Sequence, residues 1–367
     1  MTRAVVVTTW FPDRAHPSRT PFCLEHVKAV QLAGVEASVI HVELGARGPV
    51  VRETFDGLRV TRAPMPWLNP LQWIRTLRLM RTGMQEADVL HTMAFSSVLV
   101  AALPWLSQRL PWAHTEHWNG VVNPASVGGW WPRVSSLRHV LRLPHAVTGV
   151  TQELTDDMAR FTRRDATSVL PCVVHTPGAV PPFPPPRPLR LVGVGLLIDR
   201  KNPLLAIETI AWLRAQGVDV RYEWIGDGPL RQSMLDKIQE LDLEDVVSLA
   251  GAVDPARVQM MVAESHLFFV PSAQENFFTA VAEAIAVGRP AVVPRSGGFV
   301  EYCTPDNSEI ASGWTVQDLG EAVLRASARF RTASPTEVSA TVSARFSPDQ
   351  VAHLIRVMYT QAVQSHG

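Results

Sequence analysis

The chain has 367 residues, enough for two ordinary domains, because a single hydrophobic core seldom grows past about 250–300 residues. Lys plus Arg equals Asp plus Glu at 34 each, so the net charge gives no reason to expect a nucleic-acid partner. The three cysteines, Cys23, Cys172 and Cys303, are far apart and in no metal-binding spacing, which argues against a disulfide framework or zinc site and favours a reducing cytosol.

The N-terminal run MTRAVVVTTWFP is too short and too β-branched for a signal peptide. No uninterrupted apolar segment approaches the roughly 18–20 residues that a membrane-spanning helix needs. We therefore expect a soluble cytoplasmic protein, or one attached peripherally to the inner face of a membrane.

Short β-branched runs alternate with helical patterns from the N-terminus onward, which is typical of a parallel sheet with crossover helices. Helices are predicted at 21–34, which Gly34 closes, and at 96–110. Strands are predicted at 4–10, 36–42, 87–93, 111–118 and 145–151. We assign residues 1–175 to a first Rossmann-like domain.

Residues 176–188 contain seven prolines in thirteen positions and predict a stiff linker, because proline neither pairs in a sheet interior nor continues a helix. The alternation then restarts, so 189–346 is a second Rossmann-like domain and 347–367 a helix that crosses back to the first. Its strands are predicted at 189–195, 220–228, 246–253, 266–272 and 290–298, and its helices at 202–216, 229–241, 255–264 and 276–287.

Two carboxylates interrupt the apolar stretch PSAQENFFTAVAEAIAVGRP at 271–290. We predict Glu275 just past a strand end at the start of a helix, and Glu283 two turns further on, about 12 Å away. Ligands of open α/β sheets bind at the carboxyl ends of the strands, with phosphate at a helix N-terminus. The two acceptors therefore suit one long polyhydroxyl ligand.

These residues resemble a known family, the retaining glycosyltransferases of family 4, which have the GT-B fold of two facing Rossmann-like domains with a central cleft. The resemblance rests on the E-x7-E pair, the following EAIAVGRPAVV, GGFVE at 297–301, GDGP at 226–229, and Lys201 six residues after Gly195. It is strong over 189–367, and loose in the first domain through DVLHTM, TEHWNG and AVTGVTQEL.

The resemblance implies a role for each matching residue. Lys201 would neutralise the donor diphosphate, Glu275 would bind hydroxyls of the transferred sugar, and Glu283 would hold the ribose. His117 would lie beneath the donor sugar. Further donor contacts are expected from Arg200, from the GDGP residues Gly226 and Asp227, from the backbone of Asn276, Phe277, Phe278 and Thr279, and from the glycine pair Gly297 and Gly298.

The chain departs from the family pattern at three places. Leu196 stands where the family usually has Arg, so Arg200 or Arg295 is expected to take over that phosphate contact. The segment 11–22 lacks the usual glycine pair, which leaves Arg19 or Thr20 as substitutes. Phe278 stands where glycine is frequent, and we expect it to narrow the sugar pocket.

Each of these residues also has a plainer explanation. Glu275 and Glu283 alone would suit a solvated helix, and Lys201 a surface position before an N-cap at Asn202. His117 is as easily a satisfied core histidine. In HTEH, His114 and His117 lie three apart and would point to opposite faces of a strand, and the chain has no D-x-D pair, so we predict no metal and no cofactor beyond the donor substrate.

Eight of the eleven tryptophans lie before residue 132, and the segment 64–83 combines tryptophan and leucine with Arg75, Arg78 and Arg81. A basic amphipathic helix of this kind is typical of peripheral membrane contact, and equally of a helix packed on its sheet with a solvated basic face. The segment 128–142 raises the same two alternatives.

The predicted function is metal-independent, retaining transfer of a hexosyl group from a UDP- or GDP-sugar to an unidentified acceptor, which could be lipid-linked, a saccharide or a secondary metabolite. No carboxylate nucleophile is evident in the first domain, which favours same-face attack within an ion pair. The alternatives are a sugar-nucleotide epimerase of similar fold and a non-catalytic nucleotide-sugar-binding protein. A nicotinamide oxidoreductase is disfavoured, because GVGLLIDR lacks the last glycine of G-x-G-x-x-G.

Overall fold

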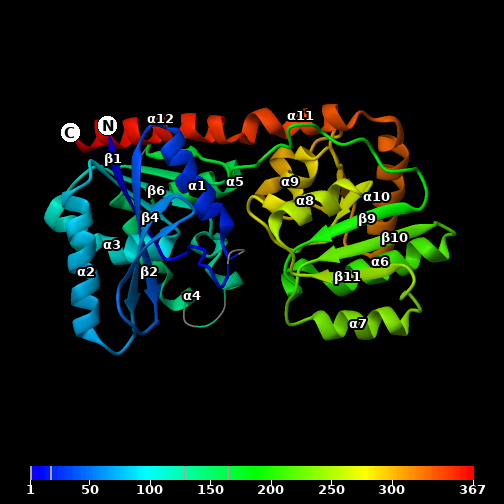
Figure 1. The fold of residues 1–367 in the computed structure, drawn as a ribbon, viewed down its shortest axis with the longest axis horizontal. Helices are drawn as coiled ribbons and strands as arrows, with labels where there is room; N and C mark the ends of the chain where they lie inside the picture. Colours follow the sequence, from blue (N-terminus) through cyan, green and yellow to red (C-terminus); the bar gives the residue numbers. More distant parts are fainter. Residues whose placement is uncertain (1, 17–18, 128, 130, 164) are drawn as a thin grey trace. The chain divides into compact units, whose positions relative to one another are not determined.

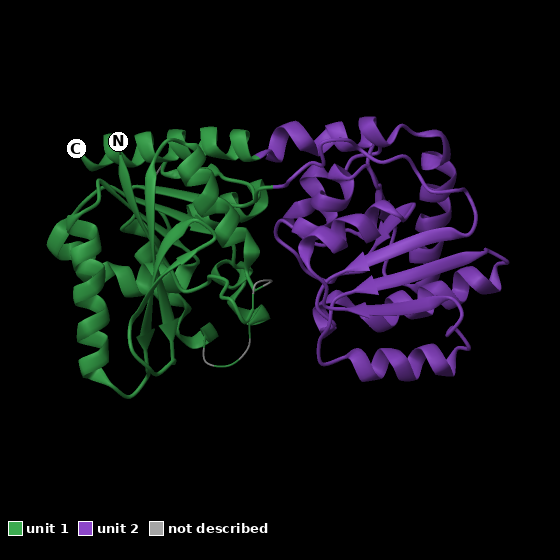
Figure 2. Cartoon of the chain, viewed as in Figure 1, with its two compact units in different colours: residues 1–173, 348–367 green, residues 174–347 purple. Residues whose placement is uncertain are grey.

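A computed structural model describes residues 2–16, 19–127, 129, 131–163 and 165–367. The chain forms two compact units, one of residues 1–173 and 348–367 and the other of residues 174–347 (Figure 2). The last segment of the chain thus belongs to the N-terminal unit.

The N-terminal unit is built on an eight-stranded sheet of order β3-β4-β2-β1-β5-β6-β7-β8, parallel except for the β3–β4 hairpin. Apolar residues fill its central strands, since both faces of a parallel sheet are covered by helices. The strands are β1 (Arg3–Thr8), β2 (Glu36–Leu44), β3 (Val51–Phe55), β4 (Leu58–Met65), β5 (Val89–Met93), β6 (Trp112–Glu116), β7 (Ala146–Gly149) and β8 (Thr167–Val169).

The last helix of the chain, α12, is part of the core of this unit. It runs beside α1 (Figure 1). Its residues Val351, Ile355 and Met358 are buried in one cluster with Val27 and Val30 of α1. The helices are α1 (Pro21–Leu32), α2 (Pro70–Gln85), α3 (Phe95–Gln108), α4 (Trp131–Val134), α5 (Gln152–Ala159) and α12 (Pro348–His366), with 3₁₀ turns at Asn119–Val121, Pro124–Ser126 and Ser135–Arg142.

The C-terminal unit has a six-stranded parallel sheet of order β11-β10-β9-β12-β13-β14. Its strands are β9 (Leu189–Val194), β10 (Val220–Ile225), β11 (Val247–Gly251), β12 (Leu267–Phe269), β13 (Ala291–Pro294) and β14 (Ser308–Ala311). Its helices are α6 (Pro203–Ala215), α7 (Arg231–Glu240), α8 (Pro255–Ala263), α9 (Thr279–Ala286), α10 (Val316–Arg329) and α11 (Pro335–Phe346), with 3₁₀ turns at Asp199–Lys201, Gly298–Tyr302 and Phe330–Thr332.

Every strand and helix that the alternation predicted is present, with ends shifted by a few residues. The β3–β4 hairpin was not predicted, although its turn has a clear signal: Asp56 and Gly57 both have positive φ, as a two-residue hairpin turn requires. The strands β8 and β14 and the helices α5, α10 and α11 were not predicted either. The amphipathic helix considered over 128–142 is wrong for its described residues, which form one helical turn and a 3₁₀ segment. Residues 128 and 130 lie outside the described part.

Arg289, the third charge of the 271–290 stretch, is fully buried and holds the proline-rich segment in place. Its guanidinium donates to the carbonyls of Pro181 (3.0 Å), Pro182 (2.7 Å) and Ala263 (3.1 Å from Nε), and lies over the ring of Phe183. Proline carbonyls have no strand partner here, so the five donors of one arginine satisfy them.

Candidate donor site

The candidate donor site lies in the C-terminal unit, in the loops that follow β9, β10, β12 and β13. Because these strands are parallel, their carboxyl ends share one edge of the sheet. Gly226 has φ 132°, and a Cβ at this position would clash with the carbonyl oxygen of Gly195. Glycine thus allows the β9 and β10 loops to approach each other by their backbones.

Lys201, Glu275 and Arg200 form a compact charged cluster in these loops. Glu275 Oε1 lies 2.6 Å from Lys201 Nζ and 2.6 Å from Arg200 NH1, and it accepts a hydrogen bond of 2.8 Å from the hydroxyl of Ser272. The side chains of Lys201 and Glu275 are only 10% and 11% exposed, whereas that of Arg200 is 45% exposed. Two of the three charges are therefore largely shielded from water.

Burial alone would raise the pKa of Glu275, but Lys201 and Arg200 together hold it below its ordinary value. Burial lowers the pKa of Lys201, and the Glu275 carboxylate opposes this effect without cancelling it. Each member of this pair thus depends on the other for its charge, because water contributes little to their solvation.

Glu275 belongs to a loop, and the prediction that it starts a helix is wrong. Helix α9 begins at Thr279, and its preceding residue, Phe278, has left-handed backbone angles of φ 49° and ψ 65°. This conformation explains why glycine suits the position, since only glycine adopts it without strain. The distance of about 12 Å along one helix axis does not apply, because only 279–283 of this stretch is helical.

The Phe278 ring lies in the core of the unit, only 4% exposed. It packs edge-on against Phe268 and Phe299, at 6.0 and 5.4 Å between ring centroids, and Lys201 Nζ lies 3.9 Å from its centroid. A cation over an aromatic face is attracted electrostatically, so Phe278 helps to hold the ammonium.

The glycine pair after β13 supports the Glu275 loop. Gly297 has φ 94°, and a Cβ there would clash with the carbonyl oxygen of Glu275. Ser296 anchors the same loops, because its hydroxyl donates to the Ser272 carbonyl (2.7 Å) and its carbonyl accepts from the Glu275 amide (3.3 Å). Gly298 is buried at the start of the following 3₁₀ turn.

The other predicted donor contacts lie around this cluster with varied exposure. Glu283 is exposed on α9, and Asp227 is exposed and accepts the amide of Gly228 (2.8 Å). Asn276 and Thr279 are half-buried, whereas the Phe277 ring is in the core beside Tyr302. Leu196 is 61% exposed, and of its two suggested substitutes Arg200 pairs with Glu275, while Arg295 is exposed.

His117 follows β6 in the N-terminal unit. The strand ends at Glu116, so His117 lies outside it, and the prediction that His114 and His117 point to opposite faces of one strand is wrong. The His117 ring lies against those of Phe22 and His26, at 4.5 and 5.0 Å between centroids, and burial holds its pKa well below the ordinary value. It is therefore a neutral imidazole at pH 7.

Of the suggested substitutes for the missing glycine loop, Arg19 is exposed and Thr20 has φ 50°.

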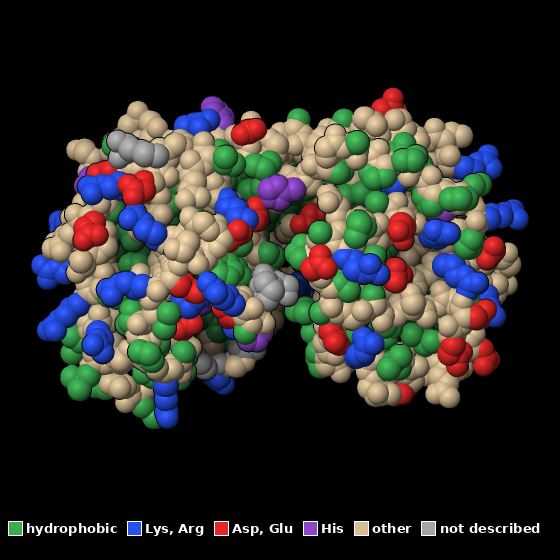
Figure 3. Space-filling view, viewed as in Figure 1, with side chains coloured by type: hydrophobic (Ala, Val, Ile, Leu, Met, Phe, Trp, Pro, Cys, Tyr) green, Lys and Arg blue, Asp and Glu red, His purple; other side chains and the backbone are tan. Residues whose placement is uncertain are grey.

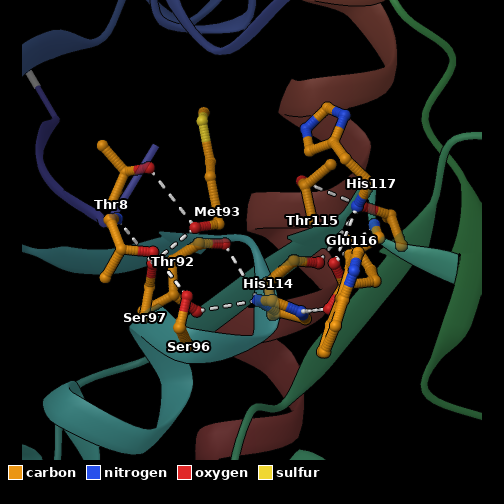
Figure 4. Close-up of polar contacts among 12 residues, drawn as sticks. Thr8, Thr92, Met93, Ser96, Ser97, His114, Thr115, Glu116 and His117 are labelled. Atoms are coloured by element: carbon orange, nitrogen blue, oxygen red, sulfur yellow. Dashed lines mark hydrogen bonds and ion pairs between the residues drawn. The ribbon is translucent and has the colours of Figure 1, made fainter. Parts of the chain in front are cut away.

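Two polar residues of these sites were overlooked in the sequence. Ser272 is signalled only weakly, as a serine directly after the buried run FFVP. Glu116 is fully buried, and an acid inside the predicted strand 111–118 was a signal that could have been used, because burying a carboxylate is costly unless it is bound (Figure 4). Among the described residues, no group of three or more His, Cys, Asp or Glu side chains could hold a metal ion.

Two Rossmann-like units in one chain, with a charged site at strand ends, define the GT-B class of folds. Sucrose-phosphate synthase from Thermosynechococcus elongatus superposes with a TM-score of 0.76 over 98% of this chain and 99% of its own, at 19% identity. Anabaena HepE, solved with UDP and glucose, superposes with a TM-score of 0.77 over 98% and 100% of the two chains, at 17% identity.

Two family descriptions match the sequence: Glycosyltransferase Family 4 over residues 22–195 and Glycosyl transferases group 1 over residues 182–328. The chain belongs to glycosyltransferase family 4.

Curated relatives match in part. A protein named as a colanic acid biosynthesis glycosyltransferase, WcaL of Salmonella typhimurium, is 32% identical over 44% of this chain and 36% of its own length. The chain thus spans about a third of the length of the first curated relatives it matches. The D-inositol 3-phosphate glycosyltransferase of Kineococcus radiotolerans is 26% identical over 78% of this chain and 75% of its own.

Proposed function

We propose that the chain transfers a hexosyl group from a UDP- or GDP-sugar to an acceptor held by the N-terminal unit, with retention of the anomeric configuration and without a metal ion. The observation that carries this proposal is the shielded Lys201–Glu275–Arg200 cluster in the strand-end loops. The matching relatives are named as glycosyltransferases, which supports glycosyl transfer as the reaction.

The charges suit the chemistry of a leaving diphosphate. As the anomeric bond breaks, negative charge gathers on the diphosphate, and cations already fixed in a poorly hydrated place stabilise that charge more than the ground state. Lys201 and the half-exposed Arg200 supply these cations. Glu275 keeps both oriented until hydroxyls of the bound sugar donate hydrogen bonds to its carboxylate oxygens. The acceptor hydroxyl then attacks the anomeric carbon on the same face within an ion pair, and its proton passes to the leaving diphosphate.

The experiment is a thermal-shift titration with UDP, GDP and NAD, followed by incubation with the corresponding sugar nucleotides. We expect UDP or GDP to raise the melting temperature and NAD to leave it unchanged. Equal protection by NAD would refute the donor assignment. Conversion of the donor to an isomer without acceptor would favour an epimerase, binding without turnover a non-catalytic protein, and an inverted product anomer would contradict retention.

We also propose that helix α2 and the loop before it contact an anionic lipid surface. The apolar side chains Trp67, Leu68 and Leu71 are 67%, 88% and 77% exposed, and Ile74 is 45% exposed. Only Thr76, Met80 and Met84 of α2 are buried, so the helix presents most of its surface outward. Figure 3 shows hydrophobic side chains beside Lys and Arg on the N-terminal unit, where α2 lies in Figure 1.

The charge of α2 supports an anionic partner. Arg75, Arg78 and Arg81 are exposed on the helix, and no acidic residue occurs between Asp56 and Glu86. Apolar side chains at one end of a helix and arginines along it match the acyl boundary and the anionic headgroups of a bilayer. No helix of the described residues has the length and apolar character to cross a bilayer.

Vesicle co-sedimentation tests this contact. We expect the wild-type protein to bind vesicles containing phosphatidylglycerol, and to bind less as salt rises, because salt screens the arginines. The double variant Leu68→Ser/Leu71→Ser is expected to weaken binding at least about tenfold, since each leucine loses roughly 1–2 kcal/mol of apolar transfer energy. Leu235→Ser, an exposed leucine of the C-terminal unit, is the control. Wild-type binding by the double variant would exclude this surface.

A further inference from the structure

We propose that Glu116 is a positioning residue for His117, the histidine that the family resemblance places beneath the donor sugar. The effect of Glu116 on catalysis rests on the proposed transfer reaction. Glu116 ends β6 and is fully buried. Its Oε1 accepts two backbone hydrogen bonds, from the amides of His117 (2.9 Å) and Trp118 (2.8 Å) (Figure 4). One carboxylate oxygen thus fixes the first two peptide groups after the strand, and with them the direction in which His117 leaves the sheet.

The other carboxylate oxygen is fixed by a chain of buried donors. Glu116 Oε2 lies 3.3 Å from His114 Nε2, and His114 Nδ1 lies 3.0 Å from the hydroxyl of Thr92. That hydroxyl accepts from Trp112 Nε1 at 2.9 Å. His114 Nδ1 also lies 3.0 Å from the Thr92 carbonyl; in the tautomer whose Nδ1 accepts from the Thr92 hydroxyl, His114 carries its proton on Nε2 and donates to Glu116. All four side chains are fully buried.

This arrangement explains how a carboxylate is tolerated inside the unit. Moving an unpaired carboxylate out of water is very unfavourable, and the three donors to Glu116 offset that cost. The same donors prevent the carboxylate from rotating, so its hydrogen bonds to the amides of residues 117 and 118 hold the backbone there in one conformation. The Phe22 and His26 rings then limit the orientation of the His117 imidazole.

Two variants separate the geometry of Glu116 from its charge. In Glu116→Gln, the amide oxygen still accepts from both backbone amides, and the amide nitrogen donates to His114 Nε2, whose other nitrogen then donates to the Thr92 carbonyl 3.0 Å away. In Glu116→Asp, the charge remains but the carboxylate is one methylene too short to reach both partners. A positioning role therefore predicts that Glu116→Gln keeps His117 in place and that Glu116→Asp does not.

The first measurement is kcat and donor KM with UDP-glucose and GDP-mannose. We expect Glu116→Gln to keep kcat within about threefold of wild type, and Glu116→Asp to lower kcat about 10²-fold with donor KM nearly unchanged, since a displacement of 1 Å in a positioned group can cost that much. The reverse order, with Gln inactive and Asp active, would show that the charge of Glu116 matters and would overturn the positioning role.

The second measurement needs no activity. Hydrogen–deuterium exchange of the amides of His117 and Trp118 is expected to be at least about tenfold faster in Glu116→Asp than in wild type, and close to wild type in Glu116→Gln. Unchanged exchange in the Asp variant would refute the inference. If the wild-type protein binds no sugar nucleotide and transfers no sugar, the proposed function fails, but the exchange rates still decide whether Glu116 holds this loop.

Discussion

Replacing Lys201 with methionine is expected to lower kcat/KM for sugar transfer by about 10²–10³-fold, the usual effect of removing one group that stabilises developing charge. Methionine keeps an unbranched apolar stem against Phe278 and removes only the ammonium. It also leaves the half-exposed Arg200 as the one cation paired with the buried Glu275 carboxylate, which is expected to cost about 3–5 kcal/mol of stability.

A double-mutant cycle separates these two effects. Glu275→Gln removes the buried charge that Lys201→Met leaves unpaired, so the double variant is expected to recover most of the lost free energy of unfolding. Activity is not expected to return, because both groups act on the donor. Urea unfolding measures the first quantity and single-turnover kinetics the second. Lys237→Met, in which a lysine of α7 loses its contact with Glu240, is the matched control and should leave both unchanged. Wild-type kcat in Lys201→Met would contradict the donor site.

Lowering the pH from 6.5 toward 4 is expected to unfold the N-terminal unit. Burial lowers the pKa of His26 and His41 from 6.5 to about 4, and it holds the pKa values of His91 and His117 well below 6.5. These imidazoles are neutral in the folded unit. Below pH 6.5 the unfolded chain binds protons that the folded chain does not, so stability falls as the pH falls and is recovered above pH 6.5.

The size of the effect follows from the pKa shifts. A shift from 6.5 to about 4 corresponds to roughly 3 kcal/mol for each of His26 and His41. Their sum approaches the total stability of about 5–15 kcal/mol that is usual for a domain. Tryptophan fluorescence can follow the transition, because eight of the eleven tryptophans lie in residues 1–173.

Single substitutions test the origin of this acid transition. His41 accepts from Arg62 (3.0 Å), so His41→Gln keeps an acceptor near Arg62. This variant is expected to reduce the pH dependence of stability by up to about 1.4 kcal/mol per pH unit between pH 4 and 6.5. His16→Gln, at an exposed position, is the control. A urea midpoint that does not change between pH 7 and 4.5 would contradict the mechanism.

Local patterns in the sequence were sufficient for the architecture. Alternation of β-branched runs with helical periods predicted both Rossmann-like units. The strands of a parallel sheet are buried on both faces and therefore appear in the sequence as short apolar runs. The E-x7-E spacing and Lys201 indicated a site in loops at one edge of the C-terminal sheet, because parallel strands bring their following loops to one edge, whatever the strand order.

Only the tertiary structure decided how those residues meet. Lys201 and Glu275 are 74 positions apart, and their ion pair exists because β9 and β12 are neighbours in the sheet. Gly297 is required by the backbone of Glu275, and Glu116 is tolerated because His114 and two backbone amides solvate it. Contacts of this kind depend on strand order and register, which residue type and spacing within a segment do not specify.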